Sequence, residues 1–196
     1  MTSKTDQKRA DLRNRLIDIA EDWIQRDGLS SIKARPLAAE AGCAVGAIYN
    51  VFGDLNELIL AVNGRTFAKL GRDVGEKGQD PSMAPADALI ALAHAYLRFA
   101  IQNPKAWRAL FDVELTADSD VPEWYSDELK RLFTYIARPV MGVYPDMGQD
   151  GVMLMTRALF SSIHGIVLLG VENRISGVPQ DKLETMIEMV LSRIAN

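Results

Sequence analysis

The sequence predicts an all-α protein of about nine helices, with a three-helix helix-turn-helix domain over residues 1–53 and a larger helical domain over 54–196. Apolar residues recur through most of the chain with the 3.6-residue period of an amphipathic helix. No segment shows the strict apolar–polar alternation of a half-buried strand, and no internal repeat is visible. Glycine and proline gather between the periodic segments, where helices are expected to end.

Composition and charge place the chain among ordinary globular proteins. It is 48% hydrophobic and 24% charged, and its single cysteine excludes a disulfide framework and favours a reducing cytoplasm. No uninterrupted apolar run reaches the roughly 20 residues of a membrane span, so we expect a cytoplasmic protein without membrane contact. The net charge is −4, but the first fifteen residues hold five basic side chains against two acidic ones. That end favours approach to phosphate, unless it is an ordinary solvated surface.

Three helices are predicted before residue 53. The first covers about residues 7–27, has one apolar face, and ends at Gly28, for which we expect a left-handed conformation. The second covers roughly 35–41 and tolerates Pro36 in its first turn, where the missing N–H has no intrahelical partner. The third covers about 45–50 and is too short to be stable alone.

The second and third helices are joined by a short turn that contains Gly42. This spacing predicts a helix-turn-helix, in which the third helix can enter a DNA major groove. Because that helix has no Lys or Arg, it lacks the fork that reads guanine, and other side chains must read bases. The candidates for DNA contact are Val45 and Ala47 on thymine methyls, Gly46 for close backbone approach, Tyr49 on a phosphate, and Asn50 on an adenine edge or a phosphate.

Two of these candidates have a plainer interpretation. Gly46 would only let two helices approach, and Tyr49 would be half-buried packing. Lys33 and Arg35 are further DNA-binding candidates, because they lie at the N-terminus of the second helix, where free N–H groups and the helix dipole suit phosphate. Both are also typical of a solvated surface, which is the less favoured interpretation.

The remaining helices follow from apolar periodicity and capping residues. Asp54 is the expected N-cap of a long helix, with Glu57 at the capping-box position, and residues 75–85 are expected to form a loop. The next helix covers about 86–102, and another begins with Asn103 as N-cap and Pro104 in its first turn. The last three are expected over 122–138, 150–173 and 179–194, with an acidic loop over 116–121 and another loop over 142–149.

The last two helices have more apolar surface than one packing face requires. Two such antiparallel helices can pair with the same two of a second copy, which predicts a homodimer with a four-helix interface. The alternative is a monomer in which both faces belong to an internal core.

Aromatic residues of the second domain are candidates to line a pocket for a small, mainly hydrophobic effector. Each of them, taken singly, is also typical of an ordinary core. The candidates for ligand binding are Phe67, Tyr96, Phe99, Trp107, Phe111, Trp124, Tyr125, Phe133, Phe160 and His164.

A series of short motifs runs in a fixed order through the first 58 residues: an amphipathic helix, Gly-Leu-Ser-Ser-Ile, Leu-Ala-Ala-Glu-Ala-Gly, Gly-Ala-Ile-Tyr, and Phe before an acidic helix start. This order resembles the DNA-binding domain of the TetR family of transcriptional repressors. The matching positions are Leu37, Ala38, Ala41, Gly42, Gly46, Ile48, Tyr49, Phe52 and Leu58. Trp107 with His164–Gly165 also resembles a C-terminal domain subtype named for a Trp, a His and a Gly.

The resemblance implies a ligand-responsive regulator that binds double-stranded operator DNA as a homodimer through its last two helices. It also implies that the effector releases the protein from a pseudo-palindromic site. Three positions depart from the family pattern: Ala44 replaces the usual Ser or Thr N-cap, Leu55 replaces a lysine, and Val51 replaces His or Tyr.

Other chemistry has little support in the sequence. Cys43, His94 and His164 are the only Cys and His residues, and there is no Gly-rich phosphate loop. We therefore expect no enzyme activity, no cofactor and no metal site. The remaining alternative is a helical interaction or ligand-sensing protein that has lost specific DNA binding, which the uncapped, cation-free third helix would favour.

Overall fold

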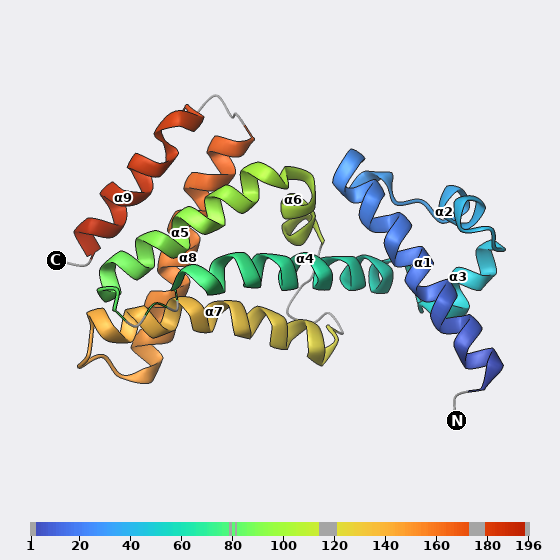
Figure 1. Ribbon diagram of the computed structural model, residues 1–196, viewed down its shortest axis with the longest axis horizontal. Helices are drawn as coiled ribbons and strands as arrows, with labels where there is room; N and C mark the ends of the chain where they lie inside the picture. The colour runs from blue at the N-terminus through green and yellow to red at the C-terminus, as the bar shows by residue number, and fades with distance from the viewer. Residues whose placement is uncertain (1–2, 79, 81, 114–120, 173–178, 195–196) are drawn as a thin grey trace. The chain divides into compact units, whose positions relative to one another are not determined.

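The computed structural model describes residues 3–78, 80, 82–113, 121–172 and 179–194. Within these residues the fold is all-α, as predicted, with nine α-helices and two short 3-10 helices (Figure 1). The α-helices are α1 (Lys4–Asp27), α2 (Ala34–Ala41), α3 (Val45–Val51), α4 (Leu55–Gly78), α5 (Pro85–Gln102), α6 (Pro104–Asp112), α7 (Glu123–Val143), α8 (Gln149–Val171) and α9 (Leu183–Ile194). The 3-10 helices are Leu29–Ser31 and Gln180–Lys182. Most of the predicted acidic loop at 116–121 lies outside the described residues.

Two predicted helix ends were wrong. Helix α4 continues through Gly75, where a loop was expected, because α7 lies against it there: a Cβ on Gly75 would stand 3.0 Å from the Tyr135 ring. Helix α7 continues past the predicted end at residue 138, with Pro139 inside it. Val140, which follows Pro139, is fully buried in the core. Close packing therefore explains one misjudged end, and continued burial the other.

The glycines on either side of α2 have positive φ, in two different conformations. Gly42 adopts a left-handed conformation after α2, with φ 66° and ψ 37°. Gly28 also has a positive φ of 86°, but its ψ of 176° is extended, so the predicted left-handed conformation was wrong. The extended ψ directs the chain away from α1 and into the 3-10 helix that follows.

The chain divides into two compact units, which are described separately. The first contains residues 1–66 and 103–125, and the second contains residues 67–102 and 126–196. The first unit therefore holds α1, α2, α3, the beginning of α4 and the whole of α6. Helix α6 thus belongs to the same unit as the helix-turn-helix, although it follows α5 in the chain.

The first unit has a core made by α1, α2, α3 and the start of α4. Trp23 is buried there, and its Nε1 donates a hydrogen bond to the Glu40 carboxylate at 3.2 Å. Ile32 packs against the same core. The fully buried side chains at its centre are Leu16, Leu37, Ile48, Phe52 and Leu58.

The second unit is built around contacts among α5, α8 and α9. Helix α9 buries Leu183, Ile187 and Leu191 at helical spacing, and α5 buries much of its length. Figure 1 shows α5 beside α9, with α8 crossing close to both.

Candidate nucleic-acid interface and effector site

The turn before α3 is closed by backbone hydrogen bonds that the conformation of Gly42 allows. The Gly42 N–H donates to the Ala39 carbonyl at 3.2 Å, and the Cys43 N–H donates to the Ala38 carbonyl at 2.9 Å. The Gly42 N–H also reaches the Ala38 carbonyl, so these bonds pair the carbonyls in the last turn of α2. Cys43 packs partly against the core.

Helix α3 begins without a side-chain cap. Ala44 has the extended conformation of an N-cap residue, with φ −73° and ψ 147°, but its methyl group cannot accept a hydrogen bond. At the other end, the Phe52 N–H donates to the Ile48 carbonyl at 2.8 Å. Ile48 is the only fully buried residue within α3, so this helix relies on its neighbours for its position.

The remaining face of α3 is open to solvent. Tyr49 is 47% exposed and Val45 is 36% exposed, so Tyr49 fits both the DNA-contact and the half-buried packing interpretation. A Cβ on Gly46 would meet nothing within 4 Å, which removes close helix packing as the reason for this glycine. Asn50 is also exposed and Ala47 is half-buried. DNA contact by these five residues stays a prediction.

The predicted phosphate-binding residues lie at the start of α2. Lys33 is the N-cap residue of α2 and Arg35 lies in its first turn, and both are exposed. At the start of α4, the Glu57 N–H donates to Asp54 at 2.8 Å, so Asp54 is the expected N-cap. The Glu57 carboxylate accepts from the Gly53 N–H at 2.7 Å, one residue earlier than a capping box requires.

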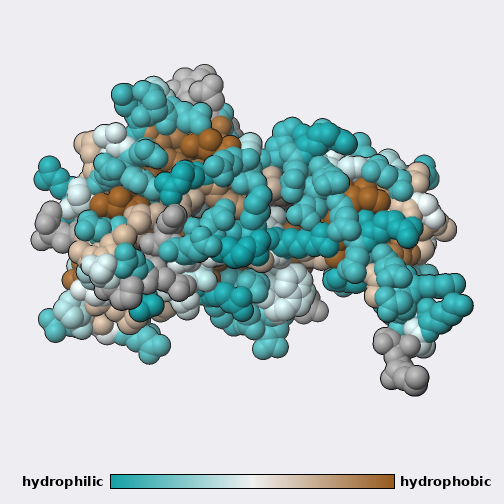
Figure 2. Space-filling view, viewed as in Figure 1, coloured by the Kyte–Doolittle hydropathy of each residue, from teal (hydrophilic) through white to brown (hydrophobic). Residues whose placement is uncertain are grey.

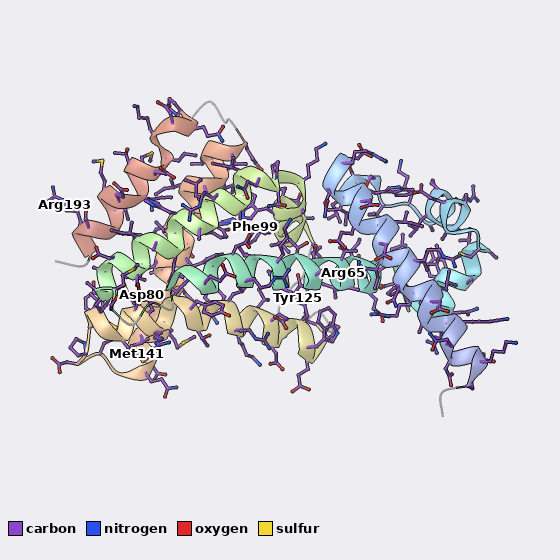
Figure 3. All side chains as sticks on the ribbon, in the orientation of Figure 1. Arg65, Asp80, Phe99, Tyr125, Met141 and Arg193 are labelled. Carbon is purple, nitrogen blue, oxygen red and sulfur yellow. The ribbon has the colours of Figure 1, made fainter. Side chains whose placement is uncertain are left out.

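Polar contacts join α4 to α1 and to α6 within the first unit. Arg65 of α4 reaches the Asp18 and Glu21 carboxylates at 2.6 and 2.8 Å (Figure 3). Burial lowers the pKa of Arg65, but these two carboxylates outweigh it and hold the pKa above its ordinary value. Asn63 is fully buried and donates to the Ala109 carbonyl of α6 at 3.0 Å. The sequence analysis did not single out these residues.

Four predicted effector-binding residues come together in the second unit. The Tyr96 hydroxyl lies 2.8 Å from Nδ1 of His164, which joins α5 to α8. The His164 and Phe160 rings stack with centroids 5.5 Å apart, and Phe133 of α7 meets Phe160 edge-on at 5.3 Å. Tyr96 is nearly buried, while the other three side chains are partly exposed. This group, called the aromatic–histidine cluster below, joins three helices.

The other predicted effector-binding residues do not belong to that cluster. Phe67 and Phe99 are buried in the second unit. The remaining four lie in the first unit as two edge-on pairs, each with centroids 5.5 Å apart: Trp107 with Phe111, and Trp124 with Tyr125.

Tyr125, which is labelled in Figure 3, is almost fully buried. Burial raises the pKa of its phenol, and the hydrogen bond with the Asn63 side chain opposes part of that rise. The environment of Tyr125 is thus that of a core residue with a satisfied polar end.

Helices α8 and α9 expose large apolar side chains in the single chain. Leu154 is 71% exposed and Met189 is 66% exposed. By length and apolar composition alone, α8 could span a membrane. The core helix of a soluble protein can have the same length and composition, and α8 also contains Arg157. Only 28% of its most apolar stretch is buried within the chain. Figure 2 shows hydrophobic atoms reaching the surface around α9.

Comparison with known proteins gives matches along most of the chain. Residues 89–194 match the family described as "Tetracyclin repressor-like, C-terminal domain". The chain is 27% identical over 181 residues to the uncharacterized HTH-type transcriptional regulator Rv0681 of Mycobacterium tuberculosis. The aligned residues cover 91% of this chain and 78% of that relative.

Solved structures show the same fold. A protein of unknown function from Rhodococcus sp. RHA1 superposes with a TM-score of 0.73 and 22% identity, over 93% of this chain and 94% of the other. RolR in complex with resorcinol superposes with a TM-score of 0.69 and 18% identity, over 96% and 89%.

Proposed function

This chain belongs to the TetR family of DNA-binding, ligand-responsive transcriptional regulators, and from that premise we propose that it is a cytoplasmic repressor rather than an enzyme. Residues 1–53 form its DNA-binding domain, and residues 54–196 bind the effector and form the homodimer. It binds a pseudo-palindromic operator and leaves it when a small hydrophobic effector binds. The Trp-His-Gly subtype remains a prediction for the C-terminal domain.

The observation that carries this proposal is the solvent-exposed face of α3. Helix α3 has seven residues and buries only Ile48. It exposes Val45, Gly46, Tyr49 and Asn50, and this exposed surface is available to enter a DNA groove. Without cations on α3, base reading uses thymine methyl contacts and the Asn50 amide, and phosphate contacts come from Tyr49 and the start of α2.

The homodimer proposal is supported by the apolar surface of α8 and α9. A helix as apolar as α8 that is mostly uncovered in one chain has a strong tendency to be covered by another surface. Pairing α8 and α9 with the same helices of a second copy would bury Leu154 and Met189 around a two-fold axis. The two α3 helices would then lie about 34–36 Å apart, or a near multiple, along one face of DNA.

The effector proposal is supported by the aromatic–histidine cluster. Its stacked and edge-on rings suit a small planar molecule, and the Tyr96–His164 pair provides polar atoms that can orient such a molecule. The fold neighbour RolR was solved with resorcinol, a molecule of this kind. We propose a small aromatic effector bound at the cluster.

Chain connectivity offers a route from effector to DNA. Tyr96 lies on α5, and α5 is followed directly by α6, which packs on α1 in the unit that contains the helix-turn-helix. An effector that moves the end of α5 would therefore act on α6 and α1. Effector and operator must weaken each other's binding by the same factor, because the coupling free energy is shared.

The test is a titration of the protein with operator-bearing DNA at several salt concentrations. The repressor proposal expects tight, sequence-specific binding whose logarithm falls with the logarithm of salt by about 0.9 per phosphate contacted. Tyr49→Ala should weaken this binding while changing the free energy of unfolding by less than about 1 kcal/mol, because Tyr49 is exposed. Equal affinity for all sequences, or none, would favour the alternative of a ligand-sensing protein without an operator.

A further inference from the structure

We propose that Arg13 and Arg15 of α1 are positioning residues that hold α3 by the residues on either side of it. They belong to the basic N-terminal segment, where a role as phosphate ligands was the obvious expectation. Although Arg15 is exposed and Arg13 partly exposed, their contacts in the structure reach the turn before α3 and the residue after it. The inference rests on α3 being the DNA-reading helix proposed above.

Arg15 acts at the start of the turn. Its Nη1 donates a hydrogen bond to the Ala41 carbonyl at 3.1 Å. Ala41 is the last residue of α2, and the Gly42 and Cys43 N–H groups already satisfy the carbonyls of Ala39 and Ala38. Arg15 thus pairs a further carbonyl at the end of α2, in a charge-assisted bond that is stronger than a neutral one. The bond fixes the chain at Ala41, three residues before Ala44, which is the N-cap residue of α3.

Arg13 acts beyond the other end of α3. Its guanidinium carbon lies 5.1 Å from the centroid of the Phe52 ring, which is within the range of a cation–π contact. Phe52 is fully buried and follows α3 directly, and its N–H closes the last turn by bonding to Ile48. Arg13 therefore covers the side chain that anchors the end of α3.

Helix α3 has unusual need of such support. It is seven residues long, has no side-chain cap at Ala44, and buries only Ile48. A short helix of this kind does not hold its own position in water. Because Arg13 and Arg15 are separated by two positions on α1, their side chains project about 200° apart, so each reaches a different neighbour of α3.

This assignment changes which cations are left for DNA. Of the five basic residues in the first fifteen, two are engaged within the protein. Lys4, Lys8 and Arg9 are exposed on α1 and remain the candidates of that helix for phosphate contact.

The experiment compares Arg13→Met and Arg15→Met with Arg9→Met, which removes the same charge from an exposed position of α1. Without DNA, amide hydrogen exchange over residues 45–52 should be about tenfold faster in the first two variants, the effect of one lost charged hydrogen bond or cation–π contact. Arg9→Met should leave that exchange unchanged. Arg15→Lys should restore most of the protection, because an ammonium group can still donate to the Ala41 carbonyl.

With operator DNA, Arg13→Met and Arg15→Met should bind about tenfold more weakly while the salt slope stays the same. A slope reduced by about 0.9, with normal exchange over 45–52, would show that these arginines contact phosphates and would overturn the inference. Equal acceleration of exchange by Arg9→Met would also overturn it. Since exchange is measured without DNA, a failure to find any operator would count against the proposed function and not against the positioning role.

Discussion

Gly46→Ala separates the stability of α3 from its use on DNA, because the two effects have opposite signs. A methyl group added at Gly46 meets no atom of the protein within 4 Å, and Gly46 has no positive φ that Ala would resist. The substitution therefore adds no strain to the fold. Whatever the methyl group disturbs must lie outside the chain.

The stability change follows from the position of Gly46 within a helix. Replacing Gly by Ala in a helix interior is worth about 0.5–1 kcal/mol, and the first turn of α3 lies at the low end of that range. For a chain of this size, 1 kcal/mol corresponds to roughly 2–4 °C in the melting temperature. We therefore expect a rise of about 1–3 °C.

The effect on DNA binding should be unfavourable. If the α3 backbone at Gly46 lies against a base or a phosphate, the methyl group must push the helix away or displace a contact in each half-site. A lost contact of this kind costs about 1–3 kcal/mol, so affinity should fall at least tenfold. Fluorescence anisotropy with operator DNA and calorimetry on the free protein measure the two effects. Unchanged affinity in a stabilised variant would refute the close approach of Gly46 to DNA.

Three further substitutions test other parts of the structure. Ala44→Ser should raise the free energy of unfolding by about 1 kcal/mol in denaturant titrations, because a hydroxyl at this extended N-cap can accept the Gly46 N–H, while the Ala47 N–H already bonds to the Ala44 carbonyl; no gain would mean that the cap geometry is wrong. If the proposed homodimer forms through α8, Leu154→Glu should convert it into monomer in sedimentation experiments, whereas Met141→Glu, at another exposed apolar position, should not. Tyr125→Phe should reduce the loss of stability at high pH. Burial raises the pKa of the Tyr125 phenol in the folded state, so the stability that the neutral phenol contributes is fully present below its ordinary pKa of 10.0. That stability is lost as pH rises through the folded-state pKa. An identical pH profile in that variant would contradict a buried, un-ionised phenol.

Local rules were sufficient for much of the DNA-binding domain. The αL glycine at 42, the Asp54 cap and the short third helix depend on residues close together in sequence, where conformational preferences are strong. The same rules failed at Gly75 and Pro139, because burial against α7 in one case and into the core in the other overrode the preference of a single residue.

The contacts of long side chains were beyond sequence reasoning. Arg13 and Arg15 read as part of a basic surface, and only the fold shows that they reach Phe52 and Ala41. The effector candidates illustrate the same limit. Aromatic residues at helical spacing do not reveal which of them converge, and the structure gathers Tyr96 with Phe133, Phe160 and His164 while placing four others in a different unit.

The poor coverage of α8 within one chain has a consequence for how this regulator responds to its own abundance. If association is what shields that helix, the folded state gains stability by mass action, and the melting temperature rises with protein concentration. Newly made single chains would then be the form most exposed to proteolysis and aggregation. The concentration of dimer able to occupy an operator would fall more steeply than the total concentration of the chain. The effector concentration needed to release the operator would therefore depend on how much of this protein the cell makes.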